Sequence, residues 1–221
     1  MVLKKLLARP PKQNSTVVQD AMARSFLILR FVVGICAFCL PMAVTLLAGH
    51  LDPTKQTSVS YYYYEARARD VFVAVLCIIG VFLLSYNVYQ KEVWIHSCMG
   101  VFALLVGMCP THSEFQPFPG LFLKIWHIHV VSAVLLFVGM EVLAWFYFPY
   151  QYSLSRGLPD RVRHLEALVY RLCAGVIVLS TIGFLLRLCI VRTQSDSLYY
   201  LEFISIMSFG VAWLTKSHAL F

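Results

Sequence analysis

Asp70, His129 and Glu202 are the residues of this chain whose types and positions suggest chemistry most directly. Each is an ionisable residue at or near the end of a different long apolar run. Ionisable side chains in membrane segments are costly to bury, so they indicate a functional site by default. Two carboxylates and an imidazole at one depth could hold a polar ligand or activate a water. We therefore predict that these three residues form a catalytic site.

Three further residues are predicted to bind the ligand at this site. Arg69 precedes Asp70, and Arg187 approaches the same membrane face from the fifth apolar run. Either guanidinium would fix an anionic headgroup. Tyr64 ends a run of four tyrosines, which is typical of the aromatic belt at a membrane interface.

A structural interpretation of the same charges stays open. Glu65 can pair with Arg69, because residues four apart share a helix face, and Arg187 can pair with Glu202 and pin the last two helices together. Asp70 lies further along its apolar run, so we expect its carboxylate to need either the pocket or a buried partner.

The fourth apolar run contains two histidines with different expected directions. His127 and His129 are two residues apart, so about 200° separates them around a helix. We expect His129 to point inward, with Ser132 on its face, and His127 to lie at the interface.

A divalent metal such as zinc is the cofactor that this site would accept. Catalytic zinc takes three protein ligands and a water, and Asp70, His129 and His112 could supply them. The three come from separate segments, and no H-E-x-x-H motif accompanies them. Haem is not expected, because His96 lies near the membrane face opposite to that of His129.

A second group of ionisable residues lies near that opposite face. It comprises Arg30, His96, Glu141, His164 and Arg171. His96 and Glu141 can meet across the third and fourth apolar runs, and we interpret this pair as packing.

The composition indicates the elements that position these residues. Of 221 residues, 60% are hydrophobic and 13% charged, whereas soluble domains average about 45–50% and about 25%. The net charge of +7 comes from residues between the apolar runs and near the N-terminus, with no basic stripe. We therefore expect a membrane protein with no nucleic-acid partner.

The apolar runs predict an all-α polytopic fold with six transmembrane helices. A span needs about 20 apolar residues. The runs are Phe26–Ala48, Val71–Tyr89, Val93–Cys109, Leu121–Phe148, Ala167–Ile190 and Leu198–Leu214. We divide the chain into a basic N-terminal segment (1–25), one six-helix domain (26–216) and a short tail (217–221).

The Lys and Arg residues predict the orientation of these spans. Twelve of the 18 fall on one side when both termini are placed inside, which the positive-inside rule favours. The first span is too long for a cleaved signal peptide, so we expect the bacterial inner membrane. The mitochondrial inner membrane is the second choice, because no acidic residue precedes Asp20.

Four segments carry a resemblance to a known family. They are YYYYEARARDVFVAVLCIIGVFLLSY (61–86), CPT (109–111), HVVSAVLLF (129–137) and LEFISIMSFGVAWLTK (201–216). With the motifs R-D-x-F-V and E…FG…W…K, the chain resembles a bacterial six-span family without an assigned activity. More distantly, it is similar in layout to the DRAM/Sfk type of membrane proteins, linked to lipid and membrane homeostasis. The layout is also similar to that of ceramidase-like hydrolases, from which six spans rather than seven set it apart. The resemblance implies a shared fold and functional importance for four residues, Arg69, Asp70, His129 and Glu202.

Two functions follow from these observations. The first is lipid handling in an outward-facing polar pocket, either headgroup binding or hydrolysis by a metal-activated water, with membrane lipid as the partner. The second is a non-catalytic structural or assembly subunit that packs against other membrane subunits. Whether the chain is an enzyme stays open. Transport is not expected, because the middles of the runs carry no continuous polar lane.

Overall fold

The described part of the chain is helical. The computed structural model describes residues 15–48, 58–86, 92–110, 121–150, 160–190 and 197–218. The α-helices are α2 (Ser15–Leu47), α3 (Ala66–Ser85), α4 (Val93–Met108), α5 (Leu121–Val142), α7 (Asp160–Ile190) and α8 (Ser197–His218). A short 3₁₀ helix, η2 (Val59–Tyr64), precedes α3, and a π-helical turn, η3 (Leu143–Tyr147), continues α5. Within these ranges the all-α prediction is confirmed.

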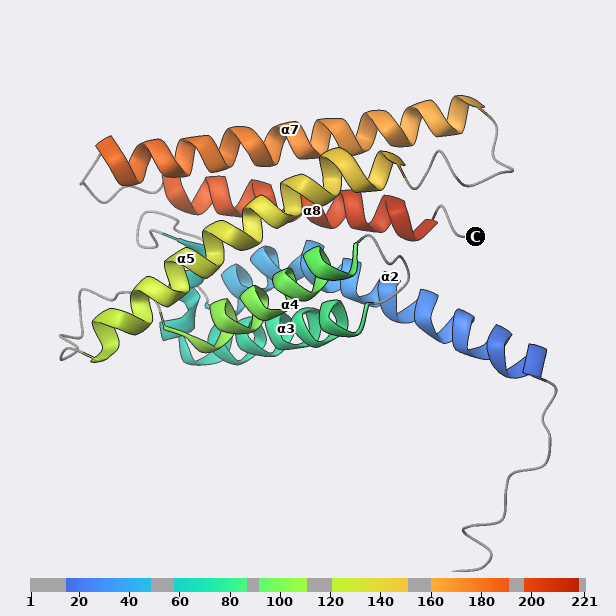
Figure 1. The fold of residues 1–221 in the computed structure, drawn as a ribbon. Helices are drawn as coiled ribbons and strands as arrows, with labels where there is room; N and C mark the ends of the chain where they lie inside the picture. Colours follow the sequence, from blue (N-terminus) through green and yellow to red (C-terminus); the bar gives the residue numbers. More distant parts are fainter. Residues whose placement is uncertain are drawn as a thin grey trace, which may run out of the picture.

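The long helices lie side by side and alternate in direction (Figure 1). α3 packs against α4, α7 against α8, and α2 against both α3 and α8, while α5 packs against α4 and α7. We call one end of the bundle the η2 end, since η2 and the starts of α3 and α8 lie there. The start of α2 and the end of α8 lie at the opposite end, the terminal end.

Five of the described helices are long and apolar enough to cross a membrane. Their membrane-length segments are Val17–Leu47, Ala66–Ser85, Ile125–Tyr150, His164–Arg187 and Leu198–Ser217. α4 is also apolar, but its 16 residues span about 24 Å, less than a hydrocarbon core of about 30 Å. These helices indicate an integral, multi-pass membrane protein. Six full spans, and the side on which the termini lie, stay predictions.

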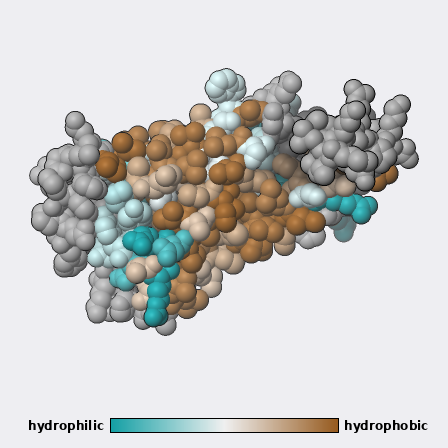
Figure 2. All heavy atoms as spheres, turned by 90° about the horizontal axis from the view of Figure 1, so that it is seen from below, coloured by the Kyte–Doolittle hydropathy of each residue, from teal (hydrophilic) through white to brown (hydrophobic). Residues whose placement is uncertain are grey.

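The outer surface of the bundle matches this conclusion. Apolar residues cover the middle of the face in Figure 2, and hydrophilic ones gather toward its two ends. Large apolar side chains such as Trp94 and Leu179 are 82% and 71% exposed. Such surface is costly in water and suits a lipid surrounding.

Two pairs of helices approach closely at glycines. A Cβ atom on Gly80 of α3 would lie 2.9 Å from the carbonyl oxygen of Gly100 in α4, and one on Gly210 of α8 would lie 2.8 Å from Cα of Phe38 in α2. Small residues at such crossings allow the backbones of membrane helices to meet. They hold α2, α3, α4 and α8 around a common interior.

Candidate functional site

Glu202 is a buried carboxylate that joins α8 to the start of η2. Its side chain is 9% exposed. Oε2 accepts hydrogen bonds from Ser58 Oγ and from the backbone N–H of Val59, each at 2.7 Å. The first N–H groups of a helix have no acceptor within the helix, and a carboxylate there also suits the helix dipole. This side chain therefore fastens the start of η2 to α8.

Tyr62 fastens the other part of η2 to the bundle. Its side chain is 1% exposed, and its ring lies edge-on to that of Tyr199 in α8, with the ring centroids 6.4 Å apart. Thr45 Oγ1 and the Tyr199 hydroxyl are themselves 2.8 Å apart. Burial raises the pKa of the Tyr62 phenol to about 12, because an ionised phenolate would lose its hydration.

A cavity of about 60 Å³ extends from Glu202 into the middle of the bundle. A water molecule needs roughly 10–15 Å³ by the same measure, so the cavity exceeds a single water site. Its wall is apolar along α2, α3, α4, α5 and α8, with Ala37, Phe72, Ala103 and Phe209 among the lining residues. Glu202 and Ser60 are the polar side chains that line it, and both lie at the η2 end.

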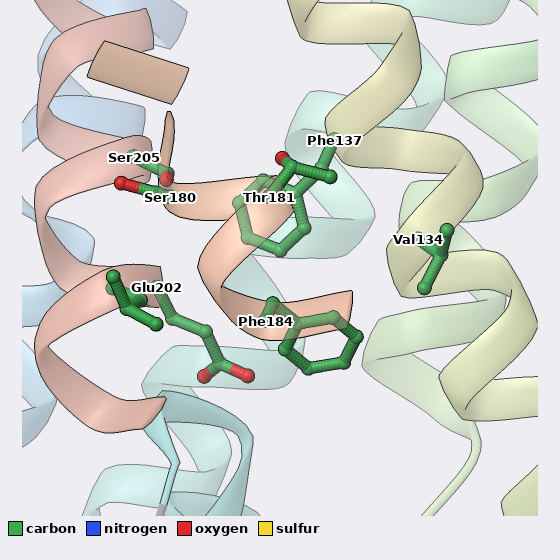
Figure 3. A pocket seen from close by; sticks show the side chains of 8 residues that line it. Val134, Phe137, Ser180, Thr181, Phe184, Glu202 and Ser205 are labelled. Carbon is green, nitrogen blue, oxygen red and sulfur yellow. The ribbon is translucent and has the colours of Figure 1, made fainter. Parts of the chain in front are cut away.

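A smaller hollow of about 10 Å³ also adjoins Glu202. Val134 and Phe137 of α5 face α7 and α8 across this hollow (Figure 3). Its polar side chains are Ser180 and Thr181 of α7, and Glu202 and Ser205 of α8. Glu202 thus lies where the apolar cavity meets a group of hydroxyls. We refer to the cavity and this hollow together as the Glu202 site.

The structure does not bring Asp70 into the Glu202 site. Its side chain is 78% exposed, and Oδ1 lies 3.4 Å from Nε of Arg69, which is 50% exposed. Ala68 and Phe72, two residues to either side, are buried. Because two helical residues span about 200°, Asp70 must face away from the bundle when these neighbours face inward.

His129 is the inward-facing histidine of its pair, as the spacing predicts. It is 3% exposed, whereas His127 is exposed beside Trp126, whose ring centroid lies 4.6 Å away. Nδ1 of His129 donates to the carbonyl oxygen of Cys109 at 2.8 Å. Cys109 caps the C-terminus of α4, so the imidazole satisfies a carbonyl that has no donor within the helix.

The proposed metal ligands are only partly described. His112 lies outside the described residues. Among the described residues of the chain, no group of three or more His, Cys, Asp and Glu side chains comes together. Asp70 lies on the exposed surface of the bundle, whereas His129 bonds to the end of α4.

The two remaining predicted residues lie in different settings. Arg187, near the end of α7, has a partly buried side chain. Tyr64 is partly buried among the tyrosines of η2, with its ring centroid 5.9 Å from that of Tyr61 and 5.6 Å from that of Tyr63. Neither Arg187 nor Tyr64 lines the cavity or the hollow of the Glu202 site.

The terminal end contains a second buried polar cluster. Arg30 of α2, Glu92 and His96 at the start of α4, and Lys216 of α8 are each 5% exposed or less. The sequence places Arg30 and His96 near one membrane face, but Glu92 and Lys216 were missed as site residues. The sequence signal for these two residues is their position. Glu92 precedes the third apolar run and Lys216 follows the sixth, and these two ends lie on the same side of the membrane when successive runs cross it in alternate directions.

Comparison with protein-family models, with curated proteins and with solved structures finds no match for this chain. The family resemblance carried by the R-D-x-F-V and E…FG…W…K segments therefore stays a prediction.

Proposed function

We propose that this multi-pass membrane protein binds a lipid whose aliphatic chain occupies the cavity of the Glu202 site. The observation that carries the proposal is the apolar cavity of about 60 Å³ with a buried carboxylate at one end. Ligand sites are commonly concave and apolar, with a few polar groups that fix orientation. A single aliphatic chain has the shape and polarity that such a wall accepts.

The polar residues of the site select the polar end of the ligand. The Glu202 carboxyl oxygens already accept from Ser58 and Val59 and have capacity to accept further hydrogen bonds. A hydroxyl, amide or ammonium group would donate to them, whereas a ligand carboxylate or a phosphate dianion has no proton to donate. The ligand class is therefore a chain lipid with a neutral or amine-bearing polar end, and Ser180, Thr181 and Ser205 offer hydroxyls beside it.

The proposal concerns binding, because the hydrogen bonds of both Glu202 and His129 are structural in kind. Glu202 fastens η2, and His129 caps α4. The same bonds suit a structural or assembly subunit, which would have no chain ligand. Metal-assisted hydrolysis stays a prediction, since His112 lies outside the described residues.

The test uses the full chain in detergent and a photoreactive long-chain alcohol as the probe. Ala133 of α5 lines the cavity, and Ala133→Leu would fill part of it. Ala66→Leu makes the same change at an exposed position of α3. The added side chain leaves less room for the aliphatic chain, so we expect labelling about tenfold weaker in Ala133→Leu and unchanged in Ala66→Leu.

Mass spectrometry of the labelled peptides should place the probe on α4, α5 and α8. A long-chain carboxylate probe should label less than the alcohol, because its carboxylate has no proton to donate to Glu202. Ala37→Leu, which fills the cavity from α2, keeps the test valid if Ala133→Leu does not fold. Equal labelling of the wild type, both cavity variants and the control would refute the proposal and favour the structural role.

A further inference from the structure

Four aromatic side chains fill the interior of the bundle beside the cavity of the Glu202 site. They are Tyr86 at the end of α3, Phe148 at the end of η3, and Phe209 and Trp213 of α8, and none is more than 5% exposed. The ring centroid of Trp213 lies 5.7–5.9 Å from those of the other three. We call these four rings the aromatic floor.

The aromatic floor closes the cavity on the side of the terminal end. α3 and α8 both run from the η2 end toward the terminal end (Figure 1). Leu83 is the last residue of α3 that lines the cavity, and Phe209 is the last of α8. Tyr86 and Trp213 follow these residues about one helical turn later. Their rings, with centroids 5.7 Å apart, therefore lie across the direction in which the cavity runs.

Contacts on the far side hold the aromatic floor in place. The indole Nε1 of Trp213 donates to the carbonyl oxygen of Arg30 in α2 at 3.1 Å. The Arg30 guanidinium carbon lies 5.9 Å from the centroid of the Tyr86 ring and 5.8 Å from that of Trp213, and ring faces attract cations. Arg30 precedes Ala37, the first residue of α2 that lines the cavity, by about two turns. An aliphatic chain that passed the floor would have to displace these rings.

The lining residues indicate the length of the cavity. They extend along α3 from Phe72 to Leu83, about 16 Å, and along α8 from Glu202 to Phe209, about 10 Å. The volume of about 60 Å³ agrees with this length. At roughly 10–15 Å³ for each water, it corresponds to about four to six water-sized groups, which in single file extend about 11–17 Å. The cavity is therefore about one aliphatic chain wide.

This length sets the number of carbons that the cavity accepts. An extended aliphatic chain advances about 1.25 Å per carbon, because C–C bonds of about 1.5 Å meet at about 111°. A length of about 10–16 Å therefore takes about 8–13 carbons. We infer, on the basis of the proposed function, that the aromatic floor restricts the Glu202 site to single-chain amphiphiles of this length. A lipid with two chains does not fit a cavity one chain wide, so the lipids of a surrounding bilayer do not fill the site.

The first experiment measures competition by straight-chain alcohols of increasing length. The full chain in detergent is labelled with a photoreactive alcohol of about 12 carbons, and unlabelled alcohols compete for the site. We expect competition to strengthen up to about 12 carbons and to weaken about tenfold by 16 carbons. Each alcohol partitions into the micelles to the same extent whichever variant is present. A comparison of variants at one chain length therefore reports on the protein.

A gain of competition by longer chains provides the second test, which a loss of folding cannot imitate. Leu83→Ala removes side-chain volume at the last lining position of α3 before the floor. Alcohols of about 14–16 carbons should then compete about tenfold more strongly than they do with the wild type. Leu179→Ala makes the same change at a side chain that is 71% exposed and should give no gain.

The opposite change at the floor should shorten the preferred chain. A Cβ atom on Gly210 would lie 2.8 Å from Cα of Phe38, so the neighbouring Ala37 lies level with the floor residue Phe209. Ala37→Leu should therefore reduce competition by an alcohol of about 12 carbons about tenfold, and leave that of an alcohol of about 8 carbons unchanged. Ala66→Leu, at an exposed position of α3, should change neither.

These measurements separate the length limit from the proposed function. If the probe labels the cavity but alcohols of all lengths compete equally, the length limit is wrong and the chain-lipid proposal stands. A folded Leu83→Ala protein with no gain for longer chains would likewise overturn the role of the floor. If Leu83→Ala does not fold, an equal loss for short and long alcohols in Ala37→Leu would overturn it instead. Absence of saturable labelling at every length would refute the proposed function itself.

Discussion

The hydrogen bonds of Glu202 allow a quantitative prediction about the η2 end. Glu202→Leu would remove the acceptor of two bonds of 2.7 Å, from the Ser58 hydroxyl and the Val59 N–H. A buried donor left without an acceptor costs about 1–3 kcal/mol. Removal of the buried carboxylate itself is favourable and offsets part of this loss. We expect Glu202→Leu to lower the free energy of unfolding by about 3 kcal/mol.

Glu202→Gln should have a smaller effect, because its amide oxygen can still accept a hydrogen bond. We expect a loss of about 1–2 kcal/mol. The assay is equilibrium unfolding in mixed detergent micelles followed by circular dichroism. Asp70→Asn makes the same carboxylate-to-amide change at a side chain that is 78% exposed, and exposed ion pairs contribute about 1 kcal/mol or less.

Hydrogen exchange supplies a local readout of the same change. The Val59 amide is buried and bonded to Glu202, so its exchange should accelerate in Glu202→Leu more than that of amides in the middle of α3. If Glu202→Leu is no less stable than Asp70→Asn, and Val59 exchanges at the wild-type rate, the assigned role of Glu202 in fastening η2 is wrong.

Three further predictions concern packing, ionisation and capping. Gly80→Ala should destabilise the protein by about 1–3 kcal/mol, because its Cβ would meet a backbone oxygen of α4 at 2.9 Å, whereas Gly175→Ala meets nothing within 4 Å; equal stabilities would contradict this. The Tyr62 phenolate band should appear at a pH of about 12, above the ordinary pKa of 10.0. Since the pKa in the folded protein is the higher one, the stabilisation by the protonated phenol is complete below pH 10 and is lost as the pH rises to 12. Tyr62→Phe should not show this loss. His129→Phe should lower the free energy of unfolding by about 1–2 kcal/mol through loss of the α4 cap, while the exposed His127→Phe should not, and an unchanged stability of both would argue against the cap.

The helices and the inward direction of His129 could be predicted from the sequence. Apolar runs report on the solvent around a segment, and the six runs correspond to α-helices in the described residues. α2 and α7 begin at Ser15 and Asp160, well before the predicted spans. Hydropathy reports where the hydrocarbon begins, while a helix can continue past it because its backbone bonds are internal.

The placement of charges could be predicted less well, because it depends on which helices become neighbours. The position of Asp70 along its apolar run predicts a carboxylate inside the bundle. The helix faces outward at Asp70, however, because Ala68 and Phe72 are the residues that it buries. Glu202 was expected to contribute to a polar site, and it lines the cavity. Its bonds to Ser58 and Val59, however, depend on η2, a segment with no apolar periodicity to predict its position.

The cavity of the Glu202 site keeps its polar and apolar surfaces apart, and this fits one orientation of a ligand. Its polar side chains, Glu202 and Ser60, lie at the η2 end, while Met99, one helical turn from His96, contributes to its apolar wall. A chain lipid with a neutral polar end therefore satisfies Glu202 while its aliphatic chain lies against that wall. Lys216→Met, near the end of α8, should accordingly leave labelling by the long-chain alcohol unchanged, because Lys216 does not line the cavity. Loss of labelling in a folded Lys216→Met protein would mean that the site extends to the end of α8.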